Sequence, residues 1–165
     1  MSKNWVMDYE TLINCFVAVF TEYKTDETHV FVIHSSRNDF TALASFLNDN
    51  IVEEQFHISF NGIHFDSQIT EYMIRDYDWL ENMPAEDIAH LLYLKAQEVI
   101  DRSNANEFSE FSERDLHIKQ LDVFKLNHWD NPAKRSSLKW IEFSMDWHNV
   151  QDMPIHHSTY INDQD

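Results

Sequence analysis

The stretch that decides the fold is WVMDYETLINCFVAVFTEY, residues 5–23. It is crowded with β-branched and aromatic residues, which favour strands. We therefore predict two strands here, Trp5–Tyr9 and Ile13–Tyr23. The polar connection Lys24–Glu27 leads into a similar run, His29–His34, as a hairpin turn would, although it lacks an Asn-Gly signal. The first part of the chain is thus predicted to be rich in strands.

The remainder of the chain alternates helical and strand patterns. Apolar residues at helical spacing predict a helix over Asp39–Asn48, and Phe56–Phe60 predicts a strand that leads into a second helical pattern. A longer helix is predicted after Pro84, a further strand at His117–Phe124, and a last helix that begins at Ser136 or Ser137. Strands first, then helices alternating with strands, predict an α/β fold with a mixed sheet and helices against it.

Size and charge limit the number of domains and the class of function. The 165 residues fit one domain, predicted at residues 1–155, with an acidic irregular tail at 156–165. Apolar residues make up 43%, enough for a packed core, so wholesale disorder is excluded. The net charge of −17 argues against a broad basic face for duplex DNA and against docking on anionic lipid. It does not exclude a nucleic-acid substrate, because carboxylates can meet a phosphate through divalent metal ions.

The single cysteine and the lack of a long apolar stretch in the sequence predict the cellular compartment. With Cys15 alone no internal disulfide is possible, and its place in an apolar strand predicts a core residue. The N-terminus lacks a secretory pattern, and no stretch is long and apolar enough to span a bilayer. We expect a soluble protein of the cytoplasm, or of the host cytoplasm if it is viral, with no membrane partner.

The first candidate motif is Asp8-Tyr9-Glu10-Thr11, at the end of an apolar strand. Residues i and i+2 of a strand point to the same side, so Asp8 and Glu10 present two carboxylates on one face. Like charges held together are costly unless a cation lies between them, and a hard ion such as Mg²⁺ or Mn²⁺ has that effect. Taken alone, the pair is more typical of two solvated acids on an exposed strand.

The second candidate motif runs from Asn61 to Asp66, directly after the predicted strand Phe56–Phe60. The single glycine of the chain, Gly62, falls at this strand-to-helix turn, where a positive φ or a close backbone approach would require it. Asp66 would then lie over the end of the sheet. A plain glycine turn, with Asp66 favouring the positive end of a helix, explains the same residues.

Together the two motifs are more specific. Asp8-x-Glu10-Thr11 followed by Asn61-x-x-x-Phe65-Asp66 resembles the 3′→5′ exonucleases of the DEDD group, and most closely the proofreading domain of family B DNA polymerases and their phage relatives. Leu121-Asp122-Val123 and Ser137-Leu138-Lys139 are similar to the family's strand, loop and helix before its last motif. The likeness spans residues 4–155 and implies a ribonuclease H-like fold, a central mixed sheet flanked by helices.

The resemblance also implies a two-metal hydrolase of DNA phosphodiester bonds. Its catalytic metal ligands for two Mg²⁺ or Mn²⁺ ions would be Asp8, Glu10 and Asp66. Four further residues would bind the single-stranded DNA 3′ end: Thr11, Leu12, Asn61 and Phe65. Without the likeness, Leu12, Asn61 and Phe65 read as packing or turn residues.

One family motif is missing. The fourth carboxylate belongs to a Tyr-x-x-x-Asp or His-x-x-x-x-Asp motif on a late helix, but counting from Tyr160 gives Gln164, and counting from His157 gives Asn162. Three alternatives stay open: a truncated chain, a short or split protein whose last helix comes from elsewhere, or a degenerate relative that has lost the chemistry.

We therefore expect a 3′→5′ exonuclease domain that is partnered by a polymerase or completed by a C-terminal segment. The alternative is a catalytically inactive interaction protein with the exonuclease fold, from a phage-like replication system. A third reading, from charge alone, is an acidic DNA mimic.

Overall fold

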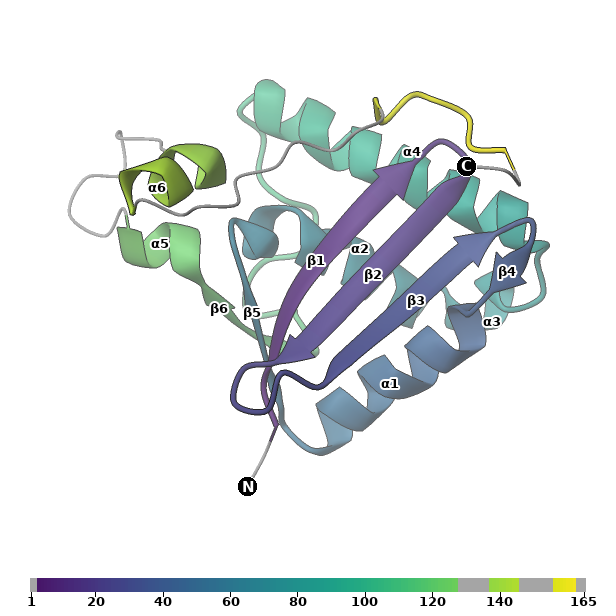
Figure 1. Cartoon of the computed structure of the whole chain (residues 1–165). Helices are drawn as coiled ribbons and strands as arrows, with labels where there is room; N and C mark the ends of the chain where they lie inside the picture. Colours follow the sequence, from purple (N-terminus) through teal and green to yellow (C-terminus); the bar gives the residue numbers. More distant parts are fainter. Residues whose placement is uncertain (1–2, 128–136, 146–155, 163–165) are drawn as a thin grey trace.

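Three antiparallel strands begin the chain and form the centre of the sheet: β1 (Trp5–Leu12), β2 (Cys15–Glu22) and β3 (Thr28–His34). They belong to a computed structural model that describes residues 3–127, 137–145 and 156–162. The complete sheet has six strands in the order β4-β3-β2-β1-β5-β6 (Figure 1). The predicted α/β class with a mixed sheet and helices is confirmed.

The turn between β1 and β2 is shorter than the sequence pattern suggested. Leu12 pairs with Cys15, so Ile13 and Asn14 alone form the turn, and β1 runs through the whole Asp8–Thr11 motif. The prediction that a strand starts at Ile13 is wrong, because an apolar turn residue continues the strand pattern. Since alternate residues of an antiparallel strand direct their amides to the partner, the Tyr9 amide faces away from β2.

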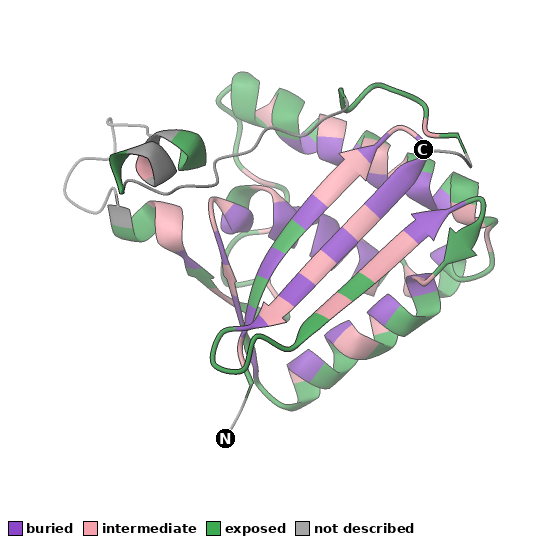
Figure 2. Ribbon diagram, viewed as in Figure 1, coloured by how far each residue is buried: buried purple, intermediate pink, exposed green. Residues whose placement is uncertain are grey.

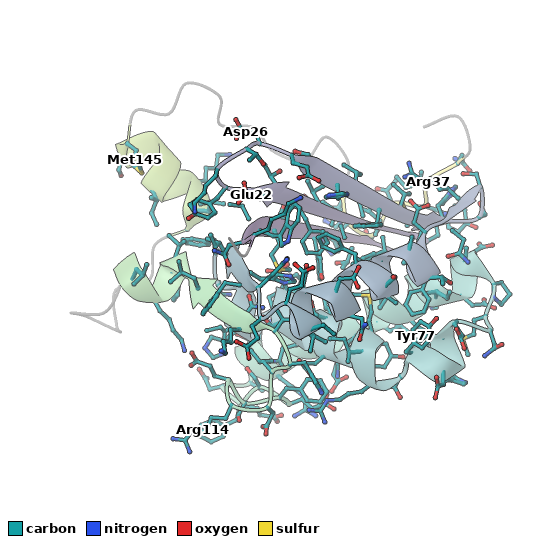
Figure 3. All side chains as sticks on the ribbon, turned by 90° about the horizontal axis from the view of Figure 1, so that it is seen from below. Glu22, Asp26, Arg37, Tyr77, Arg114 and Met145 are labelled. Atoms are coloured by element: carbon teal, nitrogen blue, oxygen red, sulfur yellow. The ribbon has the colours of Figure 1, made fainter. Side chains whose placement is uncertain are left out.

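The predicted hairpin between β2 and β3 is confirmed, and an acid explains why it needs no Asn-Gly. Glu22 accepts hydrogen bonds from the backbone N–H groups of Lys24 (2.8 Å) and Thr25 (2.7 Å). These bonds fold the chain back, as a backbone turn would. Glu22 and Asp26 lie at the end of the sheet away from Arg37 (Figure 3).

Two crossovers add the parallel part of the sheet. β4 (Arg37–Asn38) and α1 (Phe40–Val52) lead to β5 (Phe56–Ser59), which is parallel to β1. The second crossover returns the chain to β6, parallel to β5, and its elements are η1 (Gly62–His64), α2 (Asp66–Arg75), α3 (Tyr77–Leu80), α4 (Ala85–Asn104) and β6 (Lys119–Asp122). α5 (Val123–Asn127) and α6 (Leu138–Ser144) follow. The predicted strand His117–Phe124 is thus shorter, because Val123 already starts a helix.

β5 pairs with β1 over only two residue pairs, Trp5 with His57 and Val6 with Ile58. Beyond Val6, therefore, the edge of β1 is no longer covered by β5. The backbone groups of β1 that face this gap must find other partners.

Helices α1, α2 and α4 pack on one face of the sheet, where the core lies. Burial alternates along β1 and β2, as Figure 2 shows, and the buried side chains of the sheet include Met7, Tyr9, Phe16, Ala18, Phe20 and Ile33. The opposite face carries Asp8 and Glu10 together with Val6 and Val30, both 46% exposed. Cys15 is buried, as predicted.

Residues 156–162 have no regular structure but are attached to the domain. The Asn14 side chain donates to the carbonyl of Ile161 and accepts from its N–H, both at 2.8 Å. The Tyr160 hydroxyl donates to Glu86 on α4. Part of the predicted irregular tail therefore lies against the β1–β2 turn, while its last residues, 163–165, lie outside the described part. None of the described helices is long and apolar enough to cross a membrane.

Candidate functional site

The site lies where β1 and β5 separate and α2 begins. Asp66, the first residue of α2, is only 5% exposed and lies at this gap. The backbone N–H of Tyr9 interacts with the carboxylates of both Asp8 and Asp66. Two acids that are distant in sequence therefore meet at one amide of β1.

A second set of contacts fixes the start of α2 against β1. The Tyr9 hydroxyl and Thr70 Oγ1 are 2.9 Å apart, and Thr70 Oγ1 also donates to the carbonyl of Asp66 at 3.1 Å. Tyr9 is fully packed in the core, and burial raises the pKa of its hydroxyl. These bonds hold the Asp66 backbone in place without using its carboxylate.

The turn before α2 explains the single glycine. A Cβ added to Gly62 would lie 1.9 Å from Ser59 Oγ and 3.3 Å from Asp66 Oδ2, so any side chain here would collide. The positive φ of this turn falls instead on Asn61, at 60°. Of the two reasons that the sequence offered for glycine, close approach is the one that applies at Gly62.

Asp122, at the end of β6, holds this turn from the other side. Its carboxylate accepts hydrogen bonds from the backbone N–H groups of Asn61 (2.8 Å), Ile63 (3.3 Å) and Phe124 (2.9 Å). The side chain is 4% exposed. Asp122 belongs to one of the family-like segments of the sequence, but no role was predicted for it. The sequence feature that could have indicated a role is an acid at the carboxyl end of a strand, directly before a helix.

The electrostatics of Asp66 are those of an acid without a counter-charge. Burial, and next the nearby negative charge of Asp8, raise the pKa of Asp66 to about 8, with a smaller contribution from Asp122. At neutral pH the metal-free carboxyl is therefore largely protonated.

Asp8 and Glu10 share the open face of β1, as the strand pattern predicted. Partial desolvation raises the pKa of each, and the Asp8 charge raises that of Glu10 further. Charge–charge interactions thus connect each of four acids to the next one. We call these four acids the acid row: Glu10, Asp8, Asp66 and Asp122.

The acid row is not a preformed metal cage. Among the described residues, no three His, Cys, Asp or Glu side chains are grouped so that they could hold a metal ion. The structure brings Asp8 close to Glu10 and also close to Asp66. The three predicted ligands therefore interact in pairs and do not form one group. The donor chemistry, carboxylate oxygens only, is that of a Mg²⁺ or Mn²⁺ site.

The four predicted substrate residues differ in accessibility. Thr11 and Asn61 are half-buried and so present some surface. Leu12 is buried, and the half-buried Phe65 packs against the core. The last two therefore contribute to packing, whatever else they contact.

Comparison of the chain with protein-family models, with curated proteins and with solved structures found no match.

Proposed function

We propose that the chain is a divalent-metal-dependent 3′→5′ exonuclease domain of ribonuclease H-like fold, acting on the 3′ end of single-stranded DNA. The observation that carries the proposal is the meeting of Asp8 and Asp66 at the Tyr9 amide, with the pKa of Asp66 raised to about 8. Such a shift marks a functional-site candidate when burial and a specific charged neighbour cause it.

The sheet supports the proposal. β1 is an inner strand with an antiparallel neighbour, β2, and a parallel neighbour, β5, so the sheet is mixed as the family resemblance implies. The two motifs lie on β1 and at the turn after β5, which are adjacent in space. This arrangement gives the motif acids a common location without long loops.

The acids of the row are suited to bind cations rather than to pair with each other. Asp8, Glu10 and Asp66 would hold Mg²⁺ or Mn²⁺, and binding would require Asp66 to lose its proton. When bound, such ions supply an activated water and stabilise the charge on the leaving 3′-oxygen. Thr11 and Asn61, which border the row, would seat the terminal nucleotide together with Leu12 and Phe65.

Asp122 and Tyr9 have supporting roles in this proposal. Asp122 uses its oxygens on the turn, so it positions the start of α2. The hydroxyl of Tyr9 holds the first turn of α2 through Thr70, while its amide orients two carboxylates.

A second candidate function is a non-catalytic interaction protein with the same fold. It is favoured by one observation, that no three-ligand group exists among the described residues. Asp8 and Asp66 would then interact with a single cation or none, and the chain would cut no strand.

Two measurements on one set of proteins test both candidates. Mn²⁺ should raise the melting temperature of the wild type, and a 5′-labelled single-stranded DNA should shorten from its 3′ end in the presence of Mn²⁺. Asp8→Ala and Asp66→Asn should abolish both effects, whereas Asp49→Asn, at an exposed position of α1, should leave them unchanged.

The outcomes separate the candidates. An intact strand combined with Mn²⁺ stabilisation that depends on Asp8 would favour the interaction protein. An intact strand with no response to Mn²⁺ would exclude the metal site altogether.

A further inference from the structure

A groove of about 660 Å³ begins at the turn that precedes Asp66. The turn contributes Asn61 and His64 to the groove, directly after Phe60. The rest of the described lining comes from Gln68 of α2, the second half of α4, the loop 106–110, Phe124 and Ser137. The groove therefore continues away from the acid row on the α2 side of the turn.

Aromatic rings distinguish this groove. Phe60 and Phe124 line it as an edge-to-face pair with ring centroids 5.4 Å apart. Phe108 also lines it and is 95% exposed, the most exposed large apolar side chain in the described part of the chain. A phenylalanine left in water beside a groove offers a flat surface to another planar group.

The charges of the groove argue against a purely electrostatic ligand. Lys95 is only 8% exposed and forms ion pairs with Glu98 and Glu110. Arg102 forms an ion pair with Glu98 at 2.9 Å and is 3.9 Å from Glu107. The two Lys and Arg side chains of the described lining are thus outnumbered by the three acids they pair with, so phosphate attraction contributes little and planar contacts must supply the affinity.

We propose that this groove binds single-stranded DNA through its bases, upstream of the 3′ terminal nucleotide, with Phe108 stacking on one base. The proposal rests on the proposed exonuclease function, because that function places the 3′ end at the acid row. Asn61 belongs both to the groove and to the turn that carries Asp66, so a strand that ends at the row can enter the groove directly.

The experiment compares fluorescein-labelled oligothymidylates of two and eight nucleotides by fluorescence anisotropy, with Ca²⁺ and without metal. Phe108→Ala should weaken binding of the eight-nucleotide strand by roughly 5- to 150-fold, the loss expected for one base–aromatic stack. Binding of the dinucleotide should not change. Phe108→Trp should restore the affinity, and Trp79→Ala, an exposed aromatic of α3 outside the groove, should have no effect.

Salt gives a second measurement. Because the groove cations are already paired, affinity for the longer strand should fall by less than about tenfold between 50 and 200 mM salt, well below the loss for a protein with many phosphate contacts.

The groove proposal is overturned if the wild type does not bind the longer strand, or if Phe108→Ala binds it as the wild type does. Cleavage is measured separately, so the two proposals fail independently. Stacking that depends on Phe108 without any cleavage would keep the groove and remove the exonuclease. Cleavage with unchanged binding by Phe108→Ala would do the reverse.

Discussion

Two buried carboxylates, Glu22 at the end of β2 and Asp66 at the start of α2, have opposite surroundings. Burial disfavours the charge of Glu22, but hydrogen bonds from Lys24 and Thr25 outweigh this, so its pKa is lowered. At Asp66, burial and next the nearby charge of Asp8 raise the pKa to about 8. The difference teaches that hydrogen-bond donors can outweigh burial, as they do at Glu22, whereas at Asp66 burial and a neighbouring acid outweigh the backbone N–H groups of Asp66 and Tyr9.

The largest effect is expected from Asp66→Asn in the metal-free protein. The folded pKa of about 8 lies above the ordinary value of 3.8, so the wild type loses stability as pH rises between these values. The variant should lack this loss and be more stable at pH 9 by up to about 6 kcal/mol, at ~1.4 kcal/mol per pKa unit. Urea unfolding at pH 5, 7 and 9 measures the difference.

Glu22→Gln is the matched variant for this comparison. The folded pKa of Glu22 is lowered, so its contribution is present at neutral pH and disappears as pH falls through that value. Glu22→Gln should therefore destabilise the protein at pH 7 and matter less in acid. If both variants changed stability with the same sign at pH 9, the contrast between the two acids would be wrong.

Asp122→Ala should have the next largest effect. It removes the acceptor of three backbone N–H groups in a buried turn, so we expect a loss of about 2–4 kcal/mol in unfolding free energy. Binding of Mn²⁺, measured by titration well below the melting temperature, should also weaken, because the turn no longer fixes Asp66. Asp115→Ala, which removes an exposed acid bonded to Ser112, is the control. A stable Asp122→Ala protein with normal Mn²⁺ affinity would show that the turn does not depend on the hydrogen bonds that Asp122 accepts.

The smallest effect is expected from Gly62→Ala, at about 1–3 kcal/mol, because the new Cβ would meet Ser59. Ser59→Gly in the same chain should restore part of the stability by removing the colliding atoms. Urea unfolding of the two single variants and the double variant gives the coupling. Additive losses would mean that the turn moves instead of colliding.

Much of the fold could be predicted from periodicity, because strands and helices of this chain bury one face each. The β1–β2 turn was missed since Ile13 is as apolar as a strand residue, and the end of β6 since Val123 has strand character at the start of α5. No local pattern states that β5 returns parallel to β1, so the order of the strands lay beyond the sequence.

The candidate site, like the fold, could be predicted only in part from the sequence. Strand spacing was sufficient to put Asp8 and Glu10 on one face, and the structure agrees. The bonds from Asp122 to Asn61 and Ile63 join residues on different elements, so no spacing rule contains them. The pKa of Asp66 likewise depends on how deeply the turn buries it, which only packing decides.

Because β1 and β5 separate soon after they pair, one backbone amide of β1 can report on the ionisation of the site. The Tyr9 amide has no strand partner on that side and interacts with two carboxylates instead. Its hydrogen-exchange rate and its nitrogen chemical shift should therefore follow the ionisation of both acids, giving a single spectroscopic probe, native to the chain, for any cation that enters between them.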